Sequence, residues 1–259
     1  MIRHTNEATG LVWYEFSESD AGVTQAILTR LGGVSQGPFS ALNLGSTVGD
    51  DPIAVKENHR LVLTNFHLNQ SQVVSPHQVH KHHVVRVHLH HGGSVIPDTD
   101  ALITNTPGLV LLLRFADCVP VHFYDRTHHA AGLAHAGWRG IAAGVVGASV
   151  DAMRREFGSH PRDLWAGIGP AICKQHYAVN HDVVDAIRAA VPASALIAEQ
   201  VGTQWFVDLP GAVCAQLRDL GIQQIETSSL CTACQTDEFY SHRAESGMTG
   251  RFGAFVMLS

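Results

Sequence analysis

The stretch ADCVPVHFYDRTHHAAGLAHAGWRG, residues 116–140, places two polar motifs, Ala-Asp-Cys and His-Ala-Gly-Trp-Arg-Gly, in otherwise apolar sequence. Its apolar runs, 119–124 and 130–134, predict two strands joined by a polar turn. Cys118 and His135 then fall at matching points of the two strands. Such a pair is open to three interpretations: two side chains packed in the core, a nucleophile with its base, or two ligands of a metal ion.

Outside this stretch, the apolar residues follow the two periods that distinguish strands from helices. Continuous apolar runs predict strands at 108–115, 163–172 and 250–259. Helical spacing predicts helices at 49–68, 140–158 and 209–221. A segment rich in Gly, Ser and Pro predicts an ordered loop at 29–45. The pattern indicates a fold that mixes helices and strands, with its polar motifs at strand ends, where functional sites are commonly built.

The composition limits the class of protein. The chain of 259 residues is 45% hydrophobic and 15% charged, which is typical of a folded globular protein. No apolar run approaches the roughly 20 residues that a membrane span needs, and we expect no secretory signal in the first residues. A net charge of -6 argues against a general nucleic-acid or membrane-surface binder, and five cysteines fit reduced thiols in a cytosol. We expect a cytoplasmic monomer with a single domain over residues 1–259.

The metal interpretation needs a third ligand. Zinc accepts thiolate and imidazole, and catalytic zinc usually keeps three protein ligands and one open position. Cys118 and His135 would supply two of them. The segment SPHQVHKHHVV, residues 75–85, offers four candidates for the third: His77, His80, His82 and His83. In a strand beginning near Gln78, residues 78, 80 and 82 would share one face, but spacing alone does not choose among the histidines.

Nine motifs occur in order along nearly the whole chain: TRLGGVSQGPFSALNLG, QVH, DTDALIT, RFADCVPV, HAGWRG, GIGPAI, CT, FYSHR and TGR. In these motifs the sequence resembles the YfiH, or peptidoglycan-editing-factor, family. That family was first assigned as multicopper polyphenol oxidases (laccases) and has since been given purine nucleoside phosphorylase and adenosine deaminase activities. The resemblance implies one α+β domain with mixed β-sheets layered between helices, in the order α/β/β/α. It also implies that His80, Cys118 and His135 bind one catalytic zinc ion.

The reaction implied by the resemblance is zinc-dependent chemistry on purine nucleosides. It comprises phosphorolysis of adenosine, inosine, guanosine and methylthioadenosine, and deamination of adenosine, so the partners would be a nucleoside and phosphate. Because guanidinium groups suit phosphate, we expect substrate-binding residues beside the family motifs: Arg30, Asn43, Arg139, Arg243 and Arg251. A structural ion pair is the alternative for each arginine. Asp117 is a candidate general acid, or else a residue that orients a ligand.

Three other functions stay open. A copper-dependent polyphenol oxidase needs a His-Cys-His stretch, and no histidine flanks Cys118. Copper can nevertheless replace zinc in a site of this kind. A cysteine hydrolase would use Cys118 as nucleophile and His135 as base, which excludes a zinc-bound thiolate on the same molecule. The non-enzymatic alternative is a protein with a purely structural zinc.

Two further segments carry potential ligands. Lys81 stands where the family usually has glycine, and a histidine-rich run, 82–91, follows it. We expect this run to be exposed, to adsorb copper or nickel weakly, and to be dispensable for the reaction. Cys231 and Cys234, in CTAC, have the spacing of a redox or zinc pair. Because no second Cys-X-X-Cys completes a structural zinc site, we expect a buried structural Cys231 and an incidental Cys234.

Overall fold

The structure, a computed structural model, describes residues 1–17 and 22–259. Over these residues the strands form sheets of seven, six and three strands. The seven-stranded sheet consists, in spatial order, of β1 (Ile2–Asn6), β2 (Leu11–Glu15), β3 (Val23–Leu28), β16 (Phe252–Leu258), β8 (Val110–Phe115), β4 (Val73–Pro76) and β6 (Val95–Ile96). The six-stranded sheet consists of β15 (Gln224–Thr227), β11 (Leu164–Ile168), β9 (Val119–Asp125), β10 (Ala130–Ala136), β7 (Ala101–Thr104) and β5 (Val84–Arg86). The small sheet consists of β12 (Ala178–Val179), β14 (Gln204–Val207) and β13 (Ala198–Val201).

The helices differ widely in length. The α-helices are α1 (Pro52–Asn65), α2 (Trp138–Ala142), α3 (Val145–Phe157), α4 (His181–Arg188) and α5 (Leu209–Asp219). Single turns of 3-10 helix are η1 (Gly37–Phe39), η2 (Gln70–Gln72), η3 (Leu89–His91), η4 (Pro161–Asp163) and η5 (Lys174–His176). In the described part of the chain, no helix combines the length and the apolar character that crossing a bilayer requires.

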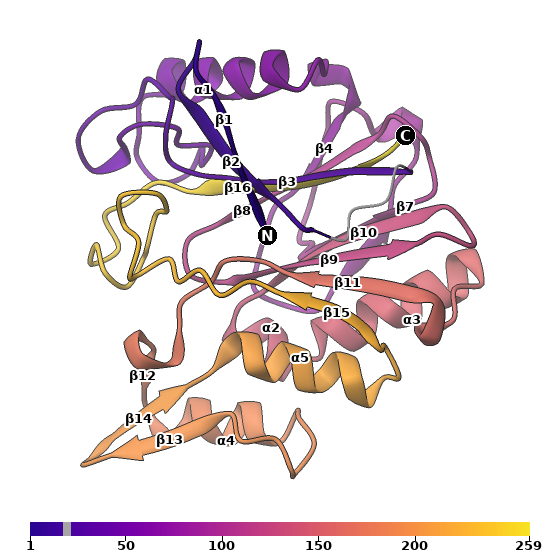
Figure 1. The fold of residues 1–259 in the computed structure, drawn as a ribbon, viewed down its shortest axis with the longest axis vertical. Coiled ribbons are helices and arrows are strands. Elements are labelled where there is room, and N and C mark those ends of the chain that lie inside the picture. The colour runs from indigo at the N-terminus through magenta and orange to yellow at the C-terminus, as the bar shows by residue number, and fades with distance from the viewer. Residues whose placement is uncertain (18–21) are drawn as a thin grey trace.

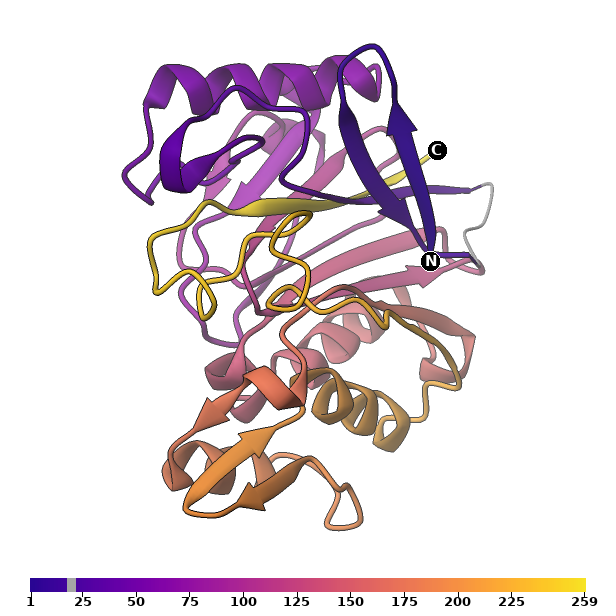
Figure 2. The ribbon, with the colours of Figure 1, turned by 60° about the vertical axis from the view of Figure 1, so that its left-hand side comes forward.

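Two of the sheets pack face to face, and helices cover their outer faces (Figure 1). The helix α1 lies over the seven-stranded sheet, whereas α2, α3 and α5 lie over the six-stranded sheet. Figure 2 shows the small sheet and α4 at the end of the molecule opposite α1. The layers therefore follow the order α/β/β/α, which confirms the α+β fold expected from the resemblance.

The strand β8 is apolar from Val110 to Leu113 because both of its faces are covered there. Leu111 and Leu113 point into the core between the two large sheets. Val110 and Leu112 point the other way, to the face where Phe66 at the end of α1 packs. A strand placed in this way has no solvent-facing side, so the alternation of polar and apolar residues disappears from its sequence.

The strands β9 and β10 form the hairpin predicted within residues 116–140. They pair antiparallel, and the register places Ala136 opposite Val119. Cys118 immediately precedes β9, so it lies at the same end of the hairpin as His135. Next to them, β11 pairs with β9 antiparallel and β15 pairs with β11 in parallel. The C-terminal ends of β11 and β15 therefore lie at the same end of the sheet as Cys118.

Two predictions of local structure are wrong. Residues 140–158 do not form one helix, because Gly144, with a φ of 84°, separates α2 from α3. The segment 77–83 is not a strand but an irregular turn between β4 and β5. His80 lies in this turn with a left-handed φ of 58°. The alternation of faces expected from Gln78 onward therefore does not apply, and hydrogen bonds to the turn decide where His80 lies.

His122 is a titratable side chain in the core between the large sheets. It is 1% exposed, and its Nε2 donates a hydrogen bond to the carbonyl oxygen of Phe255 at 3.3 Å. Burial lowers the pKa of His122 from the ordinary 6.5 to about 4. Between these two pH values the unfolded chain binds a proton that the native chain does not bind. The free energy of unfolding must therefore fall as the pH falls through this interval.

We expect this loss to amount to roughly 3 kcal/mol between pH 6.5 and about pH 4. The variant His122→Gln keeps a donor for Phe255 and removes the titration, so its free energy of unfolding should fall less over the same interval. Urea unfolding at a series of pH values measures the difference. The other histidines are common to both proteins and cancel in the comparison. Parallel pH profiles would contradict a lowered pKa for His122.

Candidate metal centre and pocket

Three potential metal ligands meet at one edge of the stacked sheets. Cys118 precedes β9, His135 lies in β10, and His80 lies in the turn between β4 and β5. One ligand atom from each side chain lies within 4.8 Å of the other two. The hairpin thus brings two of the predicted ligands together, and a turn distant in sequence adds the third.

A buried carboxylate, that of Asp100, positions two of these three side chains. It accepts hydrogen bonds from the backbone N–H groups of Val79, His80 and Lys81 at 3.2, 2.9 and 2.7 Å. It also accepts one from Nδ1 of His135 at 2.9 Å, which leaves the lone pair of Nε2 available to a metal. Asp100 therefore fixes both the turn that carries His80 and the tautomer of His135. It was not among the predicted site residues, although it lies in the motif DTDALIT.

Gly137 leaves room for the ligand side chains. A Cβ at this position would lie 2.9 Å from Sγ of Cys118 and 3.0 Å from Nδ1 of His80. Nonbonded carbon atoms do not approach other heavy atoms so closely without displacing them. The glycine of the HAGWRG motif is therefore required by the close approach of the backbone to the three ligands.

Burial and neighbouring groups shift the pKa values of Cys118, His135 and Asp100. Burial alone would raise the pKa of the Cys118 thiol, but His135 and His80 beside it lower this pKa to about 6. Burial alone would lower the pKa of His135, but Cys118 and Asp100 raise it to about 9. Burial would also raise the pKa of Asp100, whereas the hydrogen bonds from His135 and the turn lower it. A metal that displaces the second proton of His135 would meet one thiolate and two imidazoles, one of them held by a carboxylate, which is a donor set typical of zinc sites in proteins.

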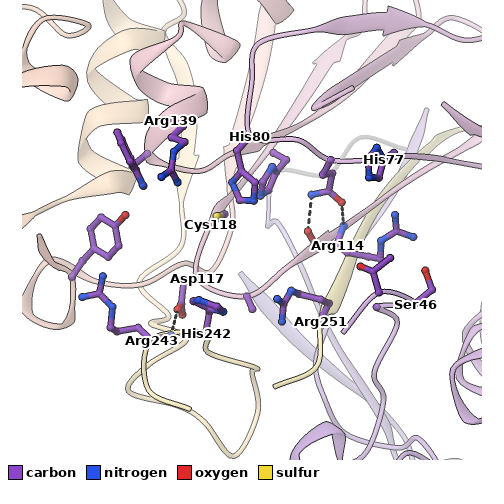
Figure 3. A pocket seen from close by; sticks show the side chains of 17 residues that line it. Ser46, His77, His80, Arg114, Asp117, Cys118, Arg139, His242, Arg243 and Arg251 are labelled. Atoms are coloured by element: carbon purple, nitrogen blue, oxygen red, sulfur yellow. Dashed lines mark hydrogen bonds between the residues drawn. The ribbon is translucent and has the colours of Figure 1, made fainter. Parts of the chain in front are cut away.

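The three ligands lie in the wall of a pocket with a volume of about 500 Å³. This volume falls in the range of roughly 300–1,000 Å³ that is usual for small-molecule sites. Four arginines line the pocket: Arg114, Arg139, Arg243 and Arg251. Figure 3 shows these arginines on both sides of Cys118. Such a lining is suited to an anion.

The pocket arginines differ in how firmly the protein holds them. The guanidinium of Arg139 is exposed and lies 4.4 Å from the centre of the Trp138 ring, with no hydrogen bond or ion pair to any described residue. Arg243 and Arg251 donate hydrogen bonds to backbone carbonyl oxygens. Arg114, at the end of β8, was missed by sequence reasoning because its strand has the pattern of a buried run. Burial lowers the pKa of Arg114.

Asp117 is the only carboxylate among the described residues that line the pocket. One of its oxygens accepts a hydrogen bond from the hydroxyl of Thr232 at 2.7 Å. The other accepts one from the backbone N–H of Arg243 at 2.7 Å, drawn in Figure 3. Both oxygens therefore hold neighbouring loops in place, and the role of Asp117 in the reaction stays a prediction.

Arg30 and Asn43 are not brought to the pocket wall with the other predicted substrate residues. Arg30 forms an ion pair with Glu245 at 3.0 Å, which is the structural alternative stated for it. Asn43 is fully buried, and its side-chain oxygen accepts a hydrogen bond from the backbone N–H of Arg251 at 2.8 Å. Both residues therefore fasten the loop 29–45 to the C-terminal part of the chain.

The histidine-rich run lies outside this pocket. None of its described residues belongs to the pocket lining. The expected exposure is confirmed for His82, His83 and His90, whereas His88 and His91 are half-buried. The rings of His90 and His91 lie 4.0 Å apart, centre to centre, in the turn η3. That the run is dispensable for the reaction stays a prediction.

Comparisons with known proteins agree with this fold and pocket. Residues 24–259 match the family described as multi-copper polyphenol oxidoreductase laccase. Purine nucleoside phosphorylase YlmD of Bacillus subtilis is 35% identical over 254 residues, which cover 94% of this chain and 91% of that protein. Purine nucleoside phosphorylase YfiH of Escherichia coli is 34% identical over 237 residues, which cover 92% and 94%. The crystal structure of YlmD from Geobacillus stearothermophilus, 34% identical, matches with a TM-score of 0.93 over 98% of both chains. The chain therefore belongs to the multi-copper polyphenol oxidoreductase laccase family, the family of YlmD and YfiH.

Proposed function

We propose that this protein is a zinc-dependent enzyme that cleaves purine nucleosides by phosphorolysis and deaminates adenosine. The observation that carries the proposal is the cluster of His80, Cys118 and His135 in the wall of an arginine-lined pocket. The relatives named purine nucleoside phosphorylase support the phosphorolytic half. The substrates would be inorganic phosphate and a nucleoside such as adenosine, inosine, guanosine or methylthioadenosine.

Zinc is the metal that we assign to this cluster. Two imidazole nitrogens and one thiolate form a three-ligand set that leaves a fourth position open. Bound there, zinc supplies a Lewis acid and lowers the pKa of a water molecule at its open position. The chain's own contribution is to hold the donors in place: Asp100 holds His135 by Nδ1, and Gly137 keeps the space beside Cys118 free.

In phosphorolysis, an oxygen of phosphate forms a bond to C1′ of the ribose while the bond from C1′ to N9 of the purine breaks. The electron pair of the broken bond goes to the purine, which takes up the proton that the phosphate gives up and leaves as the free base. The other product is ribose 1-phosphate. We assign Arg139 to the phosphate, because its guanidinium lines the pocket and has no other polar partner among the described residues.

The purine can be held by the aromatic part of the pocket. Trp138 and Tyr177 line it beside Arg139 and Arg243, and a flat base can stack on such rings. In deamination, water adds to C6 of adenine and ammonia leaves, so this reaction consumes no phosphate. The two proposed reactions therefore share the base-binding groups and differ in their need for an anion site.

Product analysis on one preparation separates this function from the alternatives. Metal-depleted protein reloaded with zinc alone should convert adenosine to inosine, and with added phosphate it should release adenine and ribose 1-phosphate. Phenol oxidation should require added copper, because zinc has no redox chemistry. A chelator should stop nucleoside turnover, whereas a cysteine hydrolase that uses Cys118 and His135 would continue without metal. Strong phenol oxidation with copper, and no nucleoside turnover with zinc, would overturn the proposal in favour of an oxidase.

The variant Arg139→Ala tests the assignment of the phosphate site. It should lower kcat/KM for phosphorolysis about 10- to 100-fold, the usual effect of losing a hydrogen bond to a charged group. Deamination should change much less, since only phosphorolysis uses phosphate as its nucleophile. The matched control is Arg60→Ala, because Arg60 forms an exposed ion pair with Glu57 on α1 and does not line the pocket. An equal loss in both reactions would show that Arg139 does not bind the phosphate.

A further inference from the structure

A second cluster of potential metal ligands lies outside the residues that line the pocket. Cys173, His176, Cys231 and Cys234 each place one ligand atom within 4.8 Å of the others. The first two come from the segment Cys-Lys-Gln-His, residues 173–176. This Cys-X-X-His segment provides the second pair of ligands that the CTAC segment lacks. Cys234 is therefore not an isolated thiol, contrary to the expectation from the sequence.

We propose that these four side chains bind a second zinc ion in a closed, structural site. Three thiolates and one imidazole fill the tetrahedron of zinc and leave no open position. Both halves have the short spacing that is common for such ligands, two residues between the members of each pair. The proposal does not depend on which reaction the pocket catalyses.

The distances within the cluster fit a zinc tetrahedron. Nδ1 of His176 lies 3.3 Å from Sγ of Cys173 and 3.4 Å from Sγ of Cys234. It lies 4.0 Å from Sγ of Cys231. In a tetrahedral site with zinc–sulfur and zinc–nitrogen bonds of about 2.3 and 2.0 Å, a ligand sulfur and a ligand nitrogen lie about 3.5 Å apart. The observed distances lie on both sides of this value, so only small movements of the side chains would close the site.

Strand pairing and hydrogen bonds join the two halves of the cluster. Because β11 and β15 are parallel neighbours, the segments that follow them leave the sheet at the same edge. Ala171 and Cys231 form a parallel bridge between these segments. The backbone N–H of Cys173 also donates a hydrogen bond to Sγ of Cys231 at 3.2 Å. Such N–H groups orient and stabilise sulfur ligands in the same way as other groups around a metal site.

A redox-active pair of cysteines does not account for this arrangement. A dithiol needs two cysteines, whereas a third sulfur and an imidazole nitrogen converge on the same point here. All five cysteines are free thiols in the structure. The fifth, Cys214, lies on α5 and is not part of either cluster, which makes it a matched control.

The second site would stabilise the wall of the pocket through the segments that carry its ligands. Thr232, between the two cysteines of the CTAC segment, donates to the carboxylate of Asp117, the neighbour of Cys118. Ile172, from the other half, donates its backbone N–H to the carbonyl oxygen of Asp117 at 3.0 Å. Tyr177, the residue after η5, lines the pocket itself. A zinc ion that joins both segments would therefore fix the loop that presents Cys118.

Zinc content tests the proposal directly. Protein purified under reducing conditions and supplied with zinc should contain two zinc ions per chain by elemental analysis. Cys234→Ser and His176→Ala should each retain one, and Cys118→Ala, which affects the pocket, should also retain one. The combination of Cys234→Ser with Cys118→Ala should retain none, and Cys214→Ser should retain two. A single zinc ion in the unchanged protein, with the same content in Cys234→Ser and His176→Ala, would overturn the proposal.

Two further measurements keep the test independent of activity and of the folding of any variant. With cobalt in place of zinc, the thiolate-to-cobalt absorption of Cys118→Ala should be strong, as expected for three thiolates, and that of Cys234→Ser weak. In the unchanged protein, alkylation should reach the half-buried Cys173 and the exposed Cys234 only after a chelator is added. Reaction of both at the rate of the half-buried Cys214 before chelation would contradict a zinc site. A protein mass lower by two hydrogens than that of the fully reduced chain would indicate a disulfide and would also overturn the proposal of a second zinc ion.

Discussion

Replacing Cys118 with alanine should remove one zinc ion per chain and lower nucleoside turnover more than about 100-fold. The loss of a group that merely supports a metal ligand already costs roughly 10- to 100-fold in affinity or activity, and the loss of a ligand costs more. The chain should stay folded, because Cys118 is only half-buried at the pocket end of the β9–β10 hairpin. The hydrogen bond between Asp100 and His135 does not involve the thiol and should persist.

Three measurements check this result: elemental analysis, turnover of adenosine with and without phosphate, and a circular dichroism spectrum to verify the fold. Cys214→Ala, which removes a half-buried cysteine from α5, is the control and should keep both metal and activity. Full zinc content in folded Cys118→Ala protein would show that the assigned ligand set is wrong. Full activity at reduced zinc content would show that the pocket metal is not catalytic.

The variant Asp100→Asn should weaken zinc binding in the pocket roughly 10- to 100-fold. Both carboxylate oxygens of Asp100 accept hydrogen bonds, from the turn at His80 and from Nδ1–H of His135, whereas an asparagine has only one acceptor oxygen. Its amide N–H₂ would face a donor, which favours the tautomer of His135 with the proton on Nε2, the nitrogen meant for the metal. Breaking a buried, charged hydrogen-bond network should also lower the free energy of unfolding by roughly 3 kcal/mol.

Competition with a chelator measures the zinc affinity of Asp100→Asn, and urea unfolding of the metal-free protein measures its stability. The control is Asp98→Asn in the same segment, because the side chain of Asp98 is 76% exposed and should tolerate the change. Unchanged affinity with reduced stability would mean that Asp100 supports the fold but not the ligands.

The hairpin and its two ligands could be predicted because the interactions that form them are local. Two apolar runs on either side of a polar turn specify β9 and β10, and their antiparallel pairing then places Cys118 beside His135. His80 could not be chosen from spacing, since it lies in an irregular turn with a left-handed φ of 58° and follows no strand periodicity. Its selection came from the resemblance to the family.

The missed residues depend on contacts between distant segments. Asp100 reaches His135 across 35 positions of sequence, and only the pairing of β7 with β10 brings them together. The second cluster joins Cys173 to Cys231 across 58 positions through the parallel pairing of β11 and β15. A search for a repeated Cys-X-X-Cys could not find it, because one of its four ligands is a histidine.

The carboxylate that holds the turn at His80 and the ring of His135 has a consequence for metal exchange. Because protein hydrogen bonds hold the two histidine donors, loading should require little movement of the chain. A preassembled site of this kind ranks metals by intrinsic affinity, and copper stands above zinc in that order. Selectivity would then lie in the cell's supply of metals and not in the protein. Protein produced in copper-rich medium would then carry copper, and an oxidase activity of such protein would reflect its growth conditions.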